Sequence, residues 1–158
     1  MQQEAISTAD LYDEFEDKLQ SISLQFQNFG ARESFFGPAK TIKCFEDNVL
    51  IKSTLNTPGE GQVLVVDGGG SLRFALMGDM IAQAAVDNGW VGVIINGAVR
   101  DRVEMATMDL GIKALGSNPR KTVKRGGGFS DLDIEIDAVT IRPGVMVYAD
   151  ADGVLVAR

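Results

Sequence analysis

The spacing of apolar residues near the start of the chain predicts a helix. After Ser7 and Thr8, which both suit an N-cap, apolar side chains recur every four residues at Leu11, Phe15 and Leu19. This period places the three side chains on one face of a helix over 9–19. We expect that face to cover the main body of the protein.

The middle of the chain alternates short apolar runs with helical patterns. The runs are nearly continuous, as in strands that are covered on both faces. The helical segments follow capping residues, such as Asp47 or Asn48, and stop at glycine-containing breakers. A strand–helix–strand series of this kind favours parallel pairing. Strands are predicted at 37–45, 62–70, 91–97 and 112–117, and helices at 49–56, 79–88 and 102–111.

The last part of the chain follows a strand pattern. Residues 118–130 are basic and rich in glycine, which is typical of a long mobile loop. From 131 to 137 apolar and acidic residues alternate, as in a strand with one solvent-exposed face. The apolar residues of 144–150 and 153–157 predict two more strands. The fold class is therefore α/β, one domain over 1–158 with central β-α-β units and a β-rich C-terminal part.

Composition limits the partners and the compartment. The chain of 158 residues has a net charge of −7, which disfavours direct nucleic-acid binding because such binding needs cationic groups that neutralise phosphates. No apolar run approaches the roughly 20 residues that span a bilayer, and the acidic start lacks the features of a signal peptide. We expect a cytoplasmic protein that binds neither nucleic acid directly nor a membrane.

The chain contains no histidine, and Cys44 is its only cysteine. These two facts exclude an intrachain disulfide, serine or cysteine catalysis that depends on histidine, and metal sites built on several cysteines or histidines. Chemistry at neutral pH would then use carboxylates, lysine, arginine, backbone dipoles or an oxygen-bound metal. Carboxylate and water ligands suit Mg²⁺ or Mn²⁺.

Residues 67–73, Asp-Gly-Gly-Gly-Ser-Leu-Arg, leave two interpretations open. Three glycines after a strand resemble a phosphate-binding loop, but their spacing matches neither GxGxxG nor GxxxxGK[ST]. The alternative is a tight turn at the end of the strand, which needs the backbone freedom of glycine.

The stretch 96–104, Asn-Gly-Ala-Val-Arg-Asp-Arg-Val-Glu, places charges directly after a buried strand. Arg102 and Glu104 fit an ordinary solvated helix start. Arg100 and Asp101 stand where open α/β sheets form ligand crevices. In that position the arginine suits a substrate carboxylate, and the aspartate suits Mg²⁺.

Gly78 and Asp79, at the start of a predicted helix, also have two interpretations. In the first, Asp79 caps its own helix. In the second, the free N–H groups of the first helical turn point into a cavity and bind an anion such as a carboxylate.

Asp79, twenty intervening residues and then Arg100-Asp101 reproduce the D-x20-R-D pattern of the RraA-like family, and Glu104 fits its extended form. The resemblance extends over about 9–157. This family joins class II pyruvate aldolases for 4-hydroxy-4-methyl-2-oxoglutarate with regulators of ribonuclease activity A. The resemblance implies the swivelling β/β/α fold of phosphohistidine domains and a homotrimer with sites between subunits. Three longer segments also resemble the family, at 29–48, 63–73 and 96–101.

The resemblance also implies a site for a small 2-oxo acid substrate. The start of the helix presents its backbone to the substrate carboxylate, Arg100 contacts the substrate oxygens, and Asp101 holds a divalent metal, Mg²⁺ or Mn²⁺, partly through water. The substrate-binding residues are then Gly78, Asp79, Met80, Ile81 and Arg100, and the catalytic residues are Arg100 and Asp101.

Two functions follow from the resemblance. The first is metal-dependent cleavage of 4-hydroxy-4-methyl-2-oxoglutarate to pyruvate, with oxaloacetate decarboxylation through the same pyruvate enolate, and neither step requires imidazole. A lysine Schiff base would instead need a desolvated amine in the cleft, and most lysines fall in polar loops, with Lys113 the exception. The second function, which segments 43–48 and 63–76 favour, is a regulator that binds ribonuclease E or its associated helicase and inhibits RNA turnover.

Overall fold

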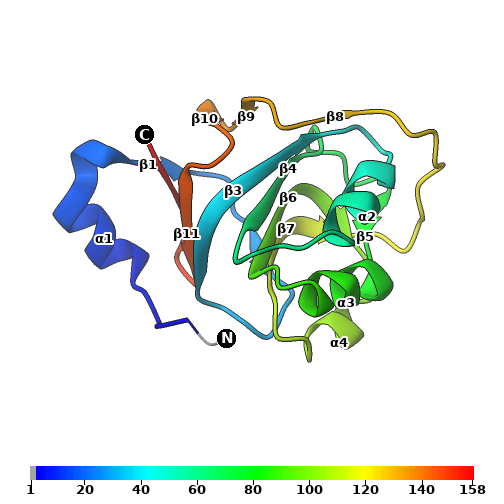
Figure 1. The fold of residues 1–158 in the computed structure, drawn as a ribbon, viewed down its shortest axis with the longest axis horizontal. Coiled ribbons are helices and arrows are strands. Elements are labelled where there is room, and N and C mark those ends of the chain that lie inside the picture. Colours follow the sequence, from blue (N-terminus) through cyan, green and yellow to red (C-terminus); the bar gives the residue numbers. More distant parts are fainter. Residues whose placement is uncertain (1–2) are drawn as a thin grey trace.

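Four strands form the parallel centre of the fold. The computed structural model describes residues 3–158. Strands β3 (Phe35–Lys43), β4 (Val63–Asp67), β6 (Gly92–Val99) and β7 (Gly111–Ser117) lie side by side in that order (Figure 1). Each neighbouring pair is parallel, so the predicted parallel pairing is confirmed.

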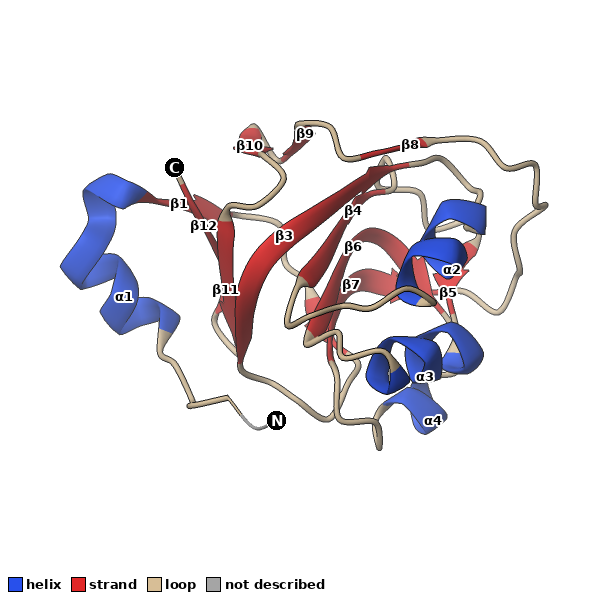
Figure 2. Cartoon of the chain, in the orientation of Figure 1, coloured by secondary structure: helices blue, strands red, loops and turns tan. Residues whose placement is uncertain are grey.

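Different layers cover the two faces of this parallel sheet. In β4, Leu64 and Val66 pack with the helical layer, whereas Val63 and Val65 pack with the β-rich layer. The apolar run of β4 therefore contributes to two cores, because neighbouring side chains of a strand point to opposite faces. The helices on the first face are α2 (Val49–Leu55), α3 (Asp79–Asp87) and α4 (Arg102–Met105) (Figure 2).

Strand β3 joins the parallel centre to an antiparallel layer. Its second edge pairs with β11 (Met146–Asp150), which is followed outward by β12 (Gly153–Ala157) and β1 (Leu19–Ile22). A separate hairpin consists of β9 (Ile134–Ile136) and β10 (Val139–Ile141). The α/β class, with central β-α-β units and a β-rich C-terminal part, is confirmed.

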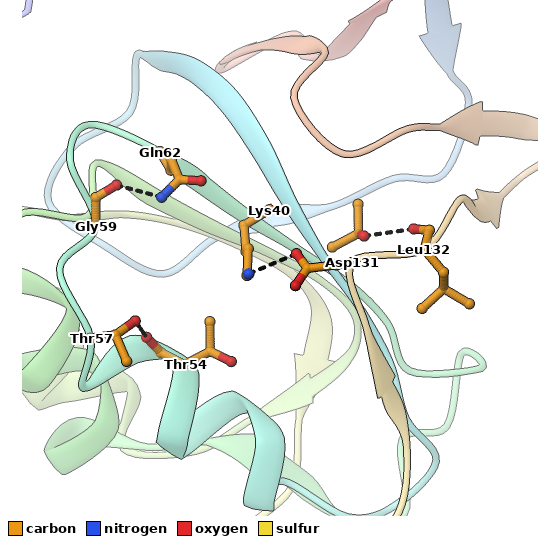
Figure 3. A network of polar contacts seen from close by, with 8 residues as sticks. Lys40, Thr54, Thr57, Gly59, Gln62, Asp131 and Leu132 are labelled. Carbon is orange, nitrogen blue, oxygen red and sulfur yellow. Dashed lines mark hydrogen bonds and ion pairs between the residues drawn. The ribbon is translucent and has the colours of Figure 1, made fainter.

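Polar contacts fasten the start of the β-rich part to β3 (Figure 3). The Lys40 Nζ atom lies 2.6 Å from Oδ1 of Asp131. The Thr41 hydroxyl donates to the carbonyl oxygen of Leu132 at 2.6 Å, and the Asp131 N–H donates to the carbonyl oxygen of Thr41 at 3.0 Å. These contacts hold residues 131–132 against the central sheet.

The side-chain caps of two predicted helices are present. The Ser7 hydroxyl accepts the N–H of Asp10 at 3.2 Å. Of the two candidates before the second helix, Asp47 provides the cap, because its Oδ1 atom accepts the Val49 N–H at 3.1 Å, and Asn48 makes no such bond.

Strand pairing overrides the helical period at 16–22. Helix α1 (Thr8–Phe15) is shorter than predicted and passes through a 3₁₀ turn, η1 (Glu16–Lys18), into β1. Leu19, expected on the helix, pairs with Ala157 in that strand and is buried. Phe15 is 40% exposed, so the apolar face of α1 covers the body only in part, and α1 projects from one end of the molecule (Figure 1).

Other differences concern short elements. Helix α4 ends at Met105 and not at 111, because the Thr107 hydroxyl bonds back to the carbonyl oxygen of Glu104 at 2.8 Å and Leu110 enters the core. Besides β10, three strands of two or three residues were not predicted, since so few positions show no period. They are β2 (Gln27–Asn28), β5 (Ala75–Met77) and β8 (Phe129–Ser130). Within residues 3–158, no helix has the length and apolar character required to cross a membrane.

Candidate active site

The candidate site lies where strands β5 and β6 end. These strands are parallel, so the residues after their carboxyl ends meet at one edge of the sheet. Gly78 and helix α3 follow β5, whereas Arg100 and Asp101 follow β6. The Arg100 N–H donates to the carbonyl oxygen of Met77 at 2.9 Å, which joins the two strand ends.

Asp101 caps helix α3 from the neighbouring strand end. Its Oδ2 atom accepts the Asp79 N–H at 3.0 Å, and Gly78 occupies the N-cap position without a side chain. The helix begins at Gly78–Asp79 as predicted, but the interpretation in which Asp79 caps its own helix is wrong. Asp101 has a φ of 63° in the left-handed region, which aspartate adopts more readily than most residues.

Gly78 leaves the space that the Asp101 carboxylate fills. A Cβ atom on Gly78 would lie 2.5 Å from Oδ2 of Asp101 and 3.3 Å from Cγ of Arg100. Contacts of 2.5 Å between such atoms are not tolerated, so the carboxylate would have to move. The close approach to the Arg100-Asp101 pair therefore favours glycine at this position.

The first turn of α3 offers two N–H groups to a ligand. Asp101 accepts the Asp79 N–H, whereas the N–H groups of Met80 and Ile81 have no acceptor within residues 3–158. Free N–H groups at a helix start, with the helix dipole behind them, suit a carboxylate. An anion at this turn would thus be held by Met80 and Ile81, whereas the Asp79 N–H, which was also expected to bind the substrate, is already bonded to Asp101.

The six residues that the sequence indicated all border one cavity of about 290 Å³. This volume is at the lower end of the range for ligand pockets and suits a small acid. Helix α2 and the 118–128 loop complete its wall. The cavity is lined by Gly78, Asp79, Met80, Ile81, Arg100 and Asp101, and also by Asn48, Lys52, Asn56, Lys121 and Lys124.

The cavity is positively charged although the protein is acidic. Four cationic and two anionic side chains line it, a formal charge of +2 against −7 for the whole chain. Such a local field attracts anions. The sequence did not indicate the lysines, because they come from segments without a recognisable spacing. The charged lining residues are Lys52, Arg100, Lys121, Lys124, Asp79 and Asp101.

The predicted loop 118–130 ends at 128 in the structure, where β8 begins, and hydrogen bonds hold this 118–128 loop beside the cavity. The Arg100 Nη1 atom donates to the carbonyl oxygen of Pro119 at 3.3 Å. The buried Thr122 hydroxyl donates to Oδ1 of Asn48 at 2.8 Å. The loop is therefore anchored both to the strand end that carries Arg100 and to the start of helix α2.

Asp47 forms a third anchor for this loop. Its Oδ2 atom accepts the N–H groups of Arg125 and Gly127 at 2.9 and 3.1 Å. Burial acts to raise the pKa of Asp47, but hydrogen bonds from Val49, Gly127 and Arg125 outweigh it and hold the pKa below its usual value. The carboxylate that fastens the loop is therefore ionised at neutral pH.

Asp101 fits a divalent metal that is held largely through water. Its Oδ2 atom accepts the Asp79 N–H, and Oδ1 has no protein partner within residues 3–158. One or two carboxylates and several waters are the usual protein ligand set for Mg²⁺. Across the same residues, no group of three or more acidic, cysteine or histidine side chains could hold a metal. Water and substrate oxygens would therefore complete the coordination.

Lys113 lies outside the cavity. It is 1% exposed, and its Nζ atom donates to the carbonyl oxygen of Asp150 at 2.5 Å. Burial lowers the pKa of Lys113, although Asp150 opposes this effect. The desolvated amine that a Schiff base requires is thus away from the candidate site, whereas the lysines of the cavity are exposed.

Two other stretches have structural roles. Gly69 and Gly70 have φ values of 69° and 74°, and the Gly70 N–H donates to the carbonyl oxygen of Asn96, so the tight-turn interpretation of 67–73 is confirmed.

Arg102 stacks its guanidinium on the Phe29 ring, with 4.8 Å between Cζ and the ring centre. It does not line the cavity.

The chain matches known proteins over nearly its whole length. A family model described as "RraA-like: Aldolase/RraA" matches residues 8–156. The chain belongs to the RraA-like family. A relative from Alkalilimnicola ehrlichii, named "Putative 4-hydroxy-4-methyl-2-oxoglutarate aldolase", is 49% identical over 154 residues, which cover 98% of this chain and 96% of the relative. The membership expected from the D-x20-R-D pattern is confirmed.

Two solved structures share the RraA-like fold. One, from Geobacillus kaustophilus, is described as an S-adenosylmethionine:2-dimethylmenaquinone methyltransferase, with 49% identity, a TM-score of 0.94 and coverage of 96% of this chain and 94% of that one. The other is the RNA-processing inhibitor RraA of a Thermus species, with 40% identity, a TM-score of 0.93 and coverage of 97% and 93%. Proteins that resemble this chain thus carry different functional descriptions. The function of this chain must therefore be argued from the residues of its own site.

Proposed function

We propose that the protein is a class II pyruvate aldolase that cleaves 4-hydroxy-4-methyl-2-oxoglutarate and also decarboxylates oxaloacetate. One observation carries this proposal: the free N–H groups of Met80 and Ile81, the Arg100 guanidinium and the Asp101 carboxylate all border one positively charged cavity. A 2-oxo acid has a carboxylate for the helix start and a keto oxygen for Arg100. The aldolase name of the relative that is 49% identical supports the same reaction.

The cavity residues have distinct roles in this reaction. Met80 and Ile81 bind the substrate carboxylate through their N–H groups, and Arg100 donates to the keto oxygen. As the C3–C4 bond breaks, the C4 hydroxyl loses its proton to water and becomes the keto group of one pyruvate, and the electron pair of the broken bond forms the enolate of the second. That enolate then takes a proton from water at C3, so no net proton is consumed. Arg100 stabilises its negative charge, and a divalent metal held at Asp101 would supply Lewis-acid stabilisation of the same charge.

The test is pyruvate release from 4-hydroxy-4-methyl-2-oxoglutarate and from oxaloacetate, measured with Mg²⁺, with Mn²⁺ and after chelation. We expect turnover of both acids with metal and its loss on chelation. If neither acid released pyruvate at any of the metal concentrations, the aldolase proposal would be rejected.

Replacing Asp101 by asparagine should separate its metal role from its helix-capping role. Asparagine also adopts the left-handed conformation and still offers an oxygen to the Asp79 N–H, so helix α3 should remain capped. A neutral amide is a poorer ligand for a hard cation. We expect an unchanged melting temperature and a Mg²⁺ requirement raised by about tenfold or more in an activity titration. An identical Mg²⁺ titration in Asp101→Asn and wild type would remove Asp101 from the metal site.

A second function has specific support from one comparison. The Thermus protein described as an RNA-processing inhibitor is 40% identical and superimposes with a TM-score of 0.93. We therefore propose binding to ribonuclease E or its associated helicase as the alternative activity, through protein contacts because the chain is acidic. Capture of purified ribonuclease E by the protein, with Arg100→Lys as a matched site variant, tests this function. Equal capture by the wild type and by Arg100→Lys would place the partner surface outside the cavity. No capture by the wild type would reject the regulator function.

We also propose a homotrimer. Met80, which lines the cavity, is 84% exposed, and Val103 of α4 is 81% exposed. Large apolar side chains this exposed indicate a surface that a partner covers. Light scattering should give about 51 kDa, three times the 16.9 kDa of one chain. Val103→Glu should shift the mass toward the monomer, since it places a charge in that surface. A stable wild-type monomer at micromolar concentration would contradict the proposal.

A further inference from the structure

Three lysines border the cavity in addition to Arg100. Lys52, Lys121 and Lys124 are exposed, whereas Arg100 and Asp101 are half-buried. The cavity therefore has an inner part, formed by the strand ends and the start of α3, and an outer part that is rich in amines.

Among the described residues 3–158, the three lysines have no carboxylate partner. The ion pairs formed within residues 3–158 are Arg32–Asp109, Lys40–Asp131, Arg73–Glu46 and Arg142–Asp133, and none of them involves a cation of the cavity. Like charges around one small space repel each other. In a chain with 22 acidic and 15 basic residues, three neighbouring amines without a counter-charge indicate that an anion belongs among them.

Independent segments bring these amines together. Lys52 lies between Asn48 and Asn56 on one face of helix α2, since residues four apart share a face, and all three line the cavity. Lys124 donates from Nζ to the Thr122 hydroxyl at 3.4 Å, and this hydroxyl is itself bonded to Asn48.

Lys121 is placed by the strand that precedes the site. It forms a parallel bridge with Ala75 of β5, and the Ala75 N–H donates to the carbonyl oxygen of Arg120 at 2.7 Å. These backbone contacts therefore place Lys121 beside the cavity.

The inner part of the cavity already accounts for one carboxylate of a substrate. There, the negative charges of Asp79 and Asp101 offset the positive charge of Arg100, and the N–H groups of Met80 and Ile81 suit a single carboxylate. A 2-oxo acid with one carboxylate would leave the outer amines without a counter-charge. An acid with a second carboxylate a few bonds further along would neutralise them.

We propose that Lys52, Lys121 and Lys124 bind a distal carboxylate and thereby select dianionic 2-oxo acids over monoanionic ones. This inference rests on the proposed function only for the orientation of the substrate, with its 2-oxo carboxylate at the start of α3. Since the amines are exposed, the selectivity depends on ionic strength, because salt screens exposed charges more than buried ones.

The experiment compares two ligands of equal length that an aldolase cannot cleave. These are 2-oxoglutarate, with a terminal carboxylate, and 2-oxopentanoate, with a terminal methyl group in its place. Isothermal titration calorimetry with Mg²⁺ gives a Kd for each ligand, and the ratio of the two values reports on the distal group alone. Calorimetry requires no turnover, so the result is independent of the catalytic assay.

The variants are Lys52→Met/Lys124→Met, the charge-preserving Lys52→Arg/Lys124→Arg, and Lys18→Met as a control. Lys18 is an exposed lysine of η1, outside the cavity. The wild type should prefer 2-oxoglutarate, and the double methionine variant should lose about tenfold or more of that preference. The arginine variant and Lys18→Met should retain it. Raising NaCl from 50 to 500 mM should weaken 2-oxoglutarate binding more than 2-oxopentanoate binding.

Two results would overturn the inference. One is an equal Kd for both ligands in the wild type, and the other is an unchanged preference in the double methionine variant. Either result leaves the proposed function intact if pyruvate is still released from 4-hydroxy-4-methyl-2-oxoglutarate. Conversely, a clear preference for 2-oxoglutarate without any turnover would support the anion subsite and reject the aldolase.

Discussion

Arg100→Lys is expected to lower kcat for oxaloacetate decarboxylation by about 10²-fold or more, the scale for loss of a preorganised electrostatic contact. Lysine keeps the charge but loses the planar fork of arginine. In the structure, the guanidinium is oriented because Nη1 donates to the carbonyl oxygen of Pro119 at 3.3 Å. If Arg100 interacts more strongly with the enolate than with the bound keto acid, the loss falls on kcat and not only on KM.

Arg102→Lys is the matched control. It is the same substitution two positions along the chain, and Arg102 lies outside the cavity, where it stacks on Phe29 and donates to the Ser117 hydroxyl. We expect kcat within about threefold of wild type, because a cation can remain over the ring. Full turnover by Arg100→Lys, or similar losses in both variants, would exclude Arg100 from the chemistry and favour the regulator function.

Gly78→Ala is expected to lower kcat/KM by about 10²-fold, the scale for a small misplacement of catalytic groups. The added methyl group would lie 2.5 Å from Oδ2 of Asp101, so the carboxylate must leave the Asp79 N–H. That one movement displaces the proposed metal ligand and uncaps helix α3. Overpacking of this kind also costs about 1–3 kcal/mol of unfolding free energy, which urea denaturation measures.

Gly116→Ala is a suitable control for this substitution. Gly116 lies in β7, and its added methyl group would meet only Cδ2 of Leu72, at an ordinary 3.6 Å. We expect nearly unchanged activity and stability. Wild-type kcat/KM in Gly78→Ala would show that the site does not depend on the close approach of Asp101 to the start of α3.

The sequence predicted those parts of the fold that have a long apolar run or period. The central strands and the start of α3 agree within a few residues, because Val63, Val65, Leu64 and Val66 fill both faces of β4 and leave a continuous signal. Leu19 shows where prediction from local spacing fails. It continues the helical period of α1, but pairing with Ala157, at the far end of the chain, places it in β1.

The candidate site was predictable only in part for a related reason. Arg100 and Asp101 follow a buried strand, and strand ends are where such sheets bind ligands. The cap of α3 by Asp101 joins residues 22 positions apart, and a local rule assigns that role to Asp79 instead. Lys121 and Lys124 lie beside the cavity because neighbouring loop residues bond to distant parts of the chain, and no spacing in the sequence reveals these bonds. They join Arg120 to Ala75, Thr122 to Asn48 and Arg125 to Asp47.

The anchoring of the 118–128 loop has a consequence for how the cavity opens. The loop is fastened by separate hydrogen bonds at Arg100, Asn48 and Asp47, and its own exposed residues add little apolar burial. A segment held in this way can detach as a local opening unit while the two cores stay folded. Amide hydrogens of Arg125 and Gly127 would then exchange with solvent earlier than those of β4 and β6. Ligand entry and release could proceed through this sub-global fluctuation, without unfolding of the sheet that positions Arg100.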